Sequence, residues 1–186
     1  MRGGRALICA LGLCIAAPAR ADVPANLYGG RIVSSRQAWF GAGFPHFEGG
    51  VRVPFGDFEL GARLRFTYGV AYATIPTTAA LVPGVDLRWQ LLESGELDGA
   101  LLASIDLGVG FPQSPVAVGI GLLSPGWLFT YRVEQLVDVD FGLRFYDDLW
   151  IQGEDVFFLL ALPIVLGLEW APSPTVNLAF RFEAGP

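Results

Sequence analysis

Residues 58–72 read FELGARLRFTYGVAY, and apolar and polar side chains alternate along the whole stretch. The even positions are all apolar or aromatic, whereas the odd positions hold Glu59, Arg63 and Arg65 among small residues. Successive side chains of a β-strand point to opposite faces, so this period of two sorts oily from charged groups. A helix would instead bring Arg63 and Phe66 to the same side. The stretch therefore predicts a β-strand with one oily face and one charged face.

The same alternation recurs along the chain, which predicts about nine strands. Besides 58–72, strands are predicted at 38–44, 51–55, 85–91, 101–111, 116–122 continuing past a Ser124-Pro125-Gly126 kink into 127–133, 137–145, 156–170 and 176–182. The pattern is typical of an all-β fold, an antiparallel up-and-down barrel of about 8–10 strands.

The predicted links alternate between short and long. In chain order they are 45–50, 56–57, 73–84, 93–96, 112–115, 134–135, 147–155 and 171–174. Outer-membrane barrels have short periplasmic turns and longer outer loops, so this order indicates an N-terminus on the periplasmic side. The link at 112–115 is short for an outer loop.

Composition is consistent with a membrane barrel. The 186 residues fit one domain, 53% of them are hydrophobic, and the mean hydropathy is +0.48. The longest apolar run, Val156–Leu168, is too short for a spanning helix of roughly 20 residues, and Pro163 interrupts it. A barrel instead spreads its apolar residues over alternate positions. The net charge of −6 argues against nucleic acid as a partner.

The first 21 residues have the features of a cleaved signal peptide. Arg2 and Arg5 precede an apolar segment at 6–17, and Ala19-Arg20-Ala21 offers a small-x-small cleavage site. The mature chain would start at Asp22, with a lead-in segment at 22–30 and the barrel domain at 31–186. A short N-terminal membrane anchor is the alternative.

Both cysteines, Cys9 and Cys14, fall inside this leader. The mature chain is therefore expected to hold no thiol, disulfide or thiolate metal site. Lipidation at Cys14 is disfavoured, because Leu13 is large for a lipoprotein signal.

The oily faces are predicted to point toward lipid. Aromatic residues cluster near strand ends, and the opposite face is rich in small residues, as a narrow interior requires. That face is also nearly balanced in charge, as expected of buried groups that must pair. It holds Arg63, Arg65, Arg88, Arg132, Arg144 and Arg181 together with Glu59, Asp86, Asp106, Asp138, Asp140, Glu169 and Glu183. A secreted lipocalin-like barrel, with Phe66, Val85 and Trp89 lining an apolar ligand site, is the alternative.

On leader, alternation, link order and aromatic placement, the chain resembles the small Gram-negative outer-membrane β-barrel proteins of OmpA/OmpX-like architecture. The resemblance implies outer-membrane localisation, a monomer, and outer-membrane lipids and the barrel-assembly machinery as partners. Two departures stand out: the chain ends in 183–186 (EAGP) without a terminal aromatic, and the strand count is odd. Either the last strand is missing, or a strand at 30–55 has been missed or divided.

Few residues suggest chemistry, and no catalytic, cofactor or metal residue is assigned. His46, the sole histidine, lies in a predicted loop, and a lipid-modifying enzyme acting through a Ser–His pair is a second alternative. The carboxylates of 147–148 and 154–155 share one predicted loop and form a candidate Ca²⁺ site, although a solvated loop is the simpler interpretation.

Two interior features also have simple interpretations. The glycines at 108, 110, 119 and 121 are predicted to point inward and to relieve crowding or permit strand bending. The inward charges are interpreted as a salt-bridged plug, with a charge-selective pore as the alternative.

Overall fold

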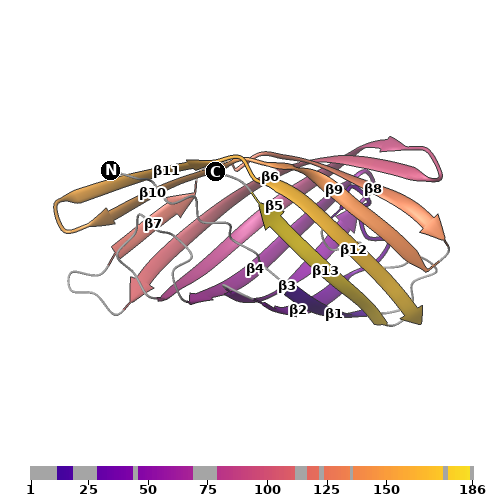
Figure 1. The fold of residues 1–186 in the computed structure, drawn as a ribbon, viewed down its shortest axis with the longest axis horizontal. Helices are drawn as coiled ribbons and strands as arrows, with labels where there is room; N and C mark the ends of the chain where they lie inside the picture. The colour runs from indigo at the N-terminus through magenta and orange to yellow at the C-terminus, as the bar shows by residue number, and fades with distance from the viewer. Residues whose placement is uncertain are drawn as a thin grey trace.

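The computed structural model describes residues 12–18, 29–43, 46–68, 79–111, 117–121, 124–134, 136–173 and 176–184. Within these ranges the chain forms strands and turns, and every strand pairing is antiparallel (Figure 1). The all-β, antiparallel prediction is thus confirmed. This part of the chain contains no helix long and apolar enough to cross a membrane. The strands are β1 (Gly12–Pro18), β2 (Gln37–Ala42), β3 (His46–Phe55), β4 (Phe58–Tyr68), β5 (Ala79–Glu93), β6 (Leu97–Phe111), β7 (Ala117–Gly121), β8 (Gly126–Glu134), β9 (Val137–Arg144), β10 (Tyr146–Gln152), β11 (Asp155–Ala161), β12 (Ile164–Ser173) and β13 (Val176–Ala184).

The strands form one curled sheet whose pairings return to their starting point. The long strand β6 makes this possible, because its first half pairs with β8 and its second half with β7. From β6 the pairings run through β5, β4, β3, β2, β1, β13, β12, β9 and β8 back to β6, which makes ten strands. Strands β7, β10 and β11 extend the sheet beyond this ring at one end, on the left in Figure 1, and β11 is its edge there.

Each of the nine predicted strands has a counterpart, and the kinked strand at 116–133 appears as β7 and β8. Ser124 and Pro125 lie outside strands between them, and Leu162 and Pro163 likewise separate β11 from β12. Proline has no N–H to donate to a ladder, so a strand commonly breaks there. The predicted strand at 58–72 is observed to Tyr68, and residues 69–72 lie outside the described ranges.

Four predicted links are wrong in extent. The link at 171–174 is mostly strand, because β12 continues to Ser173. The long loop at 147–155 is instead the hairpin β10–β11, which turns at Gly153 with φ of 63°. Strand β3 already begins at His46, inside the predicted link 45–50, and β5 begins at Ala79, inside 73–84. Glu48 in β3 and Asp148 in β10 are charged residues that lie in strands, although their segments read as loop in the sequence.

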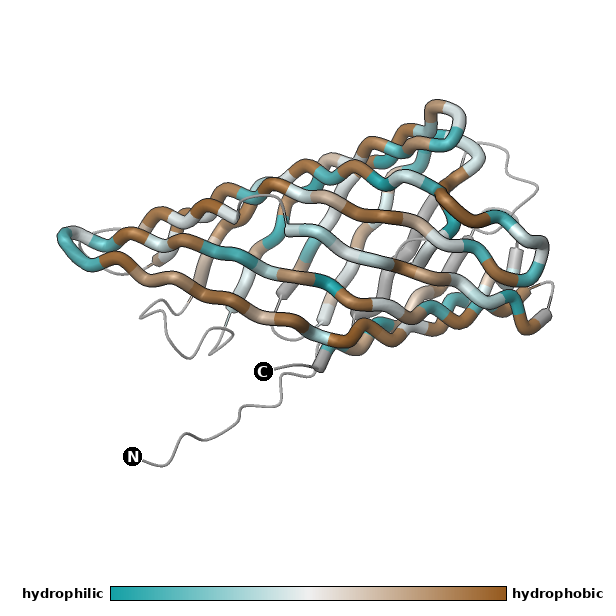
Figure 2. Tube along the Cα trace, turned by 90° about the horizontal axis from the view of Figure 1, so that it is seen from above, coloured by the Kyte–Doolittle hydropathy of each residue, from teal (hydrophilic) through white to brown (hydrophobic). Residues whose placement is uncertain are grey.

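Oily side chains point outward and charged side chains point inward. Leu64 is 51% exposed, whereas its neighbours Arg63 and Arg65 face the interior, and Glu59 is fully buried. Figure 2 shows the resulting alternation of hydrophobic and hydrophilic residues along the strands. The residues that the lipocalin-like alternative puts inside, Phe66, Val85 and Trp89, are exposed on the outside.

Strand β1 occupies a position that the sequence analysis did not foresee. It lies within the predicted leader, yet its backbone pairs with β2 on one side and β13 on the other. Both neighbours run antiparallel to β1, so β2 and β13 run parallel to each other. The same residues cannot be both a wall strand and a discarded leader. Cleavage after Ala21 would leave β2 and β13 as facing, unpaired edges.

We expect the protein isolated from the cell envelope to contain no thiol, because both cysteines precede the predicted cleavage site. The measurement is the reaction of the denatured protein with a thiol reagent. The full-length chain made in the cytoplasm, with 2 cysteines, is the control. Two reactive thiols in the envelope protein would show that β1 is retained in the wall.

Candidate functional site: the charged lumen

The barrel interior is filled by charged side chains from almost every strand of the ring. Most of the predicted inward charges are buried. Arg132 is the clearest exception, because 35% of its side chain is exposed. Its Nε lies 3.8 Å from Asp138 Oδ1. Four interior charges were missed by the sequence analysis, namely Arg31, Glu48, Arg52 and Asp98. The alternation signal was available for Arg52, which stands between Val51 and Val53. No period-two signal marks Arg31, because its segment is not a strand.

Glu59 on β4 is the centre of the interior network. Its Oε1 accepts hydrogen bonds from Arg52 Nη1 at 2.5 Å and from Arg88 Nε and Nη2 at 2.8 and 2.5 Å. Its Oε2 accepts the backbone N–H of Val33 at 2.8 Å. A fully buried carboxylate is stable only when its oxygens are satisfied in this way. Glu59 therefore ties strands β3, β4 and β5 to the segment before β2.

That segment, residues 29–33, is a plug inside the ring. Its backbone N–H groups donate to side chains of the wall: Gly30 to Thr130 Oγ1 at 2.8 Å and Ile32 to Gln90 Oε1 at 3.2 Å. Arg31 pairs with Asp98 at 2.5 Å and with Asp138 at 2.8 Å. Wall strands β5, β6, β8 and β9 thus hold the plug by both backbone and side chain.

The plug fits because its first residues are glycines. A Cβ at Gly30 would lie 2.5 Å from the carbonyl oxygen of Leu128, and one at Gly29 would overlap Thr130 and Asp140. Any larger residue would push the segment out of the lumen or separate the wall strands.

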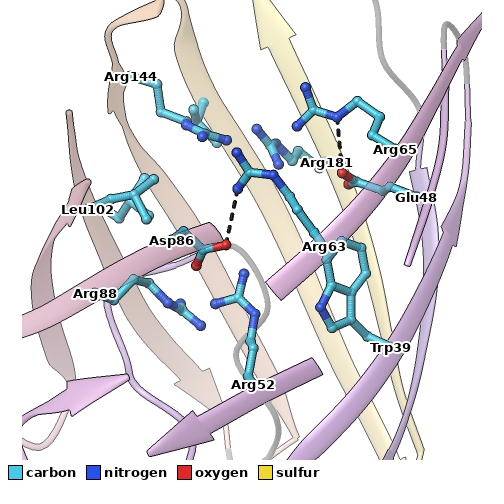
Figure 3. Close-up of a pocket in the computed structure, with 12 residues that line it drawn as sticks. Trp39, Glu48, Arg52, Arg63, Arg65, Asp86, Arg88, Leu102, Arg144 and Arg181 are labelled. Atoms are coloured by element: carbon cyan, nitrogen blue, oxygen red, sulfur yellow. Dashed lines mark hydrogen bonds and ion pairs between the residues drawn. The ribbon is translucent and has the colours of Figure 1, made fainter. Parts of the chain in front are cut away.

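A cavity of about 30 Å³ remains in the interior, lined in part by Arg52 and Arg88, the two arginines that bind Glu59 (Figure 3). Arg63 spans it, pairing with Asp86 at 3.1 Å and Asp106 at 2.6 Å, and Arg65 lies 3.4 Å from Glu48. The lining residues are Trp39, Glu48, Arg52, Arg63, Arg65, Asp86, Arg88, Leu102, Leu128, Arg144, Val165 and Arg181. This volume suits one or two water-sized groups.

At the end where β7, β10 and β11 extend the sheet, the interior becomes apolar around Trp150. The ring of this residue lies over two glycines, and a Cβ at Gly108 or Gly119 would approach it to 2.6 or 2.5 Å. It packs with Ala80, Val82 and Ala117, and Phe157 joins from β11. The prediction that inward glycines relieve crowding is therefore confirmed for Gly108 and Gly119, and the crowding group is an indole.

The other candidate chemical groups are not brought together. Asp147 and Asp148 lie within β10, whereas Glu154 and Asp155 lie at its turn. Within the described ranges, no group of three or more His, Cys, Asp and Glu residues is placed to hold a metal ion. The backbone of His46 pairs with Thr67, and its side chain lies outside what the structure describes.

We expect Glu59→Gln to lower the free energy of unfolding by about 3–5 kcal/mol, because Arg52 and Arg88 would lose a buried counter-charge. The measurement is urea unfolding of the protein folded in detergent, followed by heat-modifiable migration on a gel. Glu154→Gln, in the exposed β10–β11 turn, is the matched control and should change stability by less than about 0.5 kcal/mol. Equal effects of the two variants would contradict the central role of Glu59.

No family model matches the chain, and no curated protein matches it. Its function is therefore inferred from the geometry of the wall and the lumen.

Proposed function

We propose that this chain is an integral β-barrel of the bacterial outer membrane with an occluded lumen and a structural or adhesive role. The observation that carries the proposal is the orientation of the wall, with oily side chains outside and paired charges inside. In water, a continuous exposed apolar surface would drive association. In a bilayer the same apolar surface contacts the lipid acyl chains, and the inward charges are kept away from lipid.

Aromatic pairs at the two ends of β4 support a membrane position. Phe58 stacks on Trp89 with ring centres 5.6 Å apart, and Tyr68 stacks on Phe47 at 5.0 Å. The two pairs are separated by the length of β4, roughly 33 Å at a rise of about 3.3 Å per residue. A strand tilted by about 40° then spans roughly 25 Å along the barrel axis, the height of an outer-membrane apolar band.

The plug and the ion pairs favour a structural or adhesive role over a pore. Residues 29–33 cross the interior, and the central cavity is about 30 Å³. A lipocalin-like role would need an apolar interior ligand site, whereas most of the described buried residues are polar or charged. An enzymatic role through His46 stays an alternative, because the side chain of His46 lies outside what the structure describes.

Lipid contact is tested with brominated acyl chains, which quench tryptophan fluorescence on contact. In variants that keep a single tryptophan, we expect strong quenching of Trp89 or Trp127, which are 43% and 54% exposed. Trp150, which is 3% exposed and faces inward, is the matched control and should be quenched much less. Equal quenching of the outward and inward tryptophans would contradict the proposal, as would recovery of the protein as a soluble periplasmic species.

Occlusion gives a separate prediction in planar bilayers. The intact protein should show no steady conductance, whereas deletion of residues 22–33 should produce discrete conductance steps, because the plug is removed. Arg36→Gln, an exposed change beside the plug, should stay silent. Porin-like conductance of the intact protein, or a silent deletion variant, would contradict an occluding role for residues 29–33.

A further inference from the structure

The central cavity carries an excess of positive charge. Its lining includes six arginines, Arg52, Arg63, Arg65, Arg88, Arg144 and Arg181, but only two carboxylates, Glu48 and Asp86. Several of these arginines pair with carboxylates of the surrounding network, as Arg63 does with Asp106. Arg144 also lies at ion-pair distance from Glu183, but two of its nitrogens, Nε and Nη2, have no hydrogen-bond partner among the described residues.

Arg144, at the end of β9, is buried, with 5% of its side chain exposed. Its Nη1 lies 4.0 Å from Glu183 Oε1, which is the limit of an ion pair, and its guanidinium stacks over the ring of Tyr146. Its Nε and Nη2 have no hydrogen-bond partner among the described residues. Two buried donors of a permanent cation are therefore left without an acceptor, which is a costly arrangement in a protein interior.

Figure 3 shows where these donors point. The guanidinium groups of Arg144, Arg63 and Arg181 converge from β9, β4 and β13 on one side of the cavity. Like charges approach in this way at low cost only when anions lie among them, and Asp86 and Glu183 supply part of that negative charge. Arg181 also pairs with Glu183, so the carboxylate shared with Arg144 is already engaged.

We propose that the central cavity binds one small anion of halide size, held by Arg144 together with Arg63 and Arg181. A volume of about 30 Å³ accommodates such an ion but is tight for sulfate or phosphate with their four oxygens. The inference goes beyond the proposed function: it concerns the lumen alone and does not depend on what surrounds the wall.

The test uses the full chain folded in detergent micelles, with chloride as the probe. Thermal unfolding is followed by near-ultraviolet circular dichroism in sodium gluconate, sodium chloride, sodium bromide and sodium sulfate at one ionic strength. Chloride at about five times its dissociation constant should raise the unfolding midpoint by roughly 2–4 °C relative to gluconate. Bromide should act like chloride, and sulfate like gluconate. An equal response to all four salts would overturn the proposal.

Variants assign the effect to the cavity. Arg144→Gln should abolish the chloride-specific shift, whereas Arg36→Gln, which removes an exposed arginine, should retain it. If Arg144→Gln does not fold, halide binding is tested instead by the width of the chloride-35 resonance in the presence of the unaltered protein. Binding broadens that line, and bromide should restore it by competition. A chloride response unchanged in Arg144→Gln, or no broadening with the unaltered protein, would show that the cavity holds no halide. Because all measurements are made in micelles, failure here is distinguishable from failure of lipid contact.

Discussion

The need to pair charges inside a narrow ring constrains the rest of this structure. Glu59 is fully buried and receives two arginines and a backbone N–H. Because an isolated buried carboxylate is unstable, Arg52 and Arg88 must be held in place by their strands, β3 and β5. The requirement fixes the register of β3, β4 and β5, since a slip by one residue would turn Arg52, Glu59 and Arg88 outward. It also holds residues 29–33 in the lumen, where Val33 completes the shell.

Space is the second constraint on the interior. The ring is too small for large side chains at every inward position. Glycines therefore face the larger groups at each level of the interior. Gly29 and Gly30 admit the plug at one level, while Gly108 and Gly119 admit Trp150 at another. The interior thus has a charged part around Glu59 and an apolar part around Trp150. Such filling is compatible with an occluded barrel and leaves only a small cavity among the arginines.

The number of strands in the ring bears on the leader predicted at the N-terminus. An antiparallel meander of nine strands begins and ends with strands that run in the same direction, so it cannot close with an antiparallel pair. In this structure β1 supplies the tenth strand between β2 and β13. Its residues also have the composition of a signal peptide. The nine predicted strands therefore lacked one strand of the ring, and that strand lies at 12–18, neither at the C-terminus nor at 30–55.

The sequence by itself determined the strands and the sorting of their faces. Period-two alternation is a local property, so Glu59, Arg63 and Arg88 were assigned to the charged face from neighbours alone. The same argument failed for the loop predicted at 147–155, where Asp147 and Asp148 resemble loop residues but lie in a strand beside β7.

Only the tertiary structure decided which charges meet and what fills the space between them. Arg31 reaches Asp98 and Asp138 across separations of 67 and 107 residues, and Trp150 lies on Gly108 and Gly119 from another strand. No local pattern carries this information, because such contacts arise from the curl and closure of the sheet.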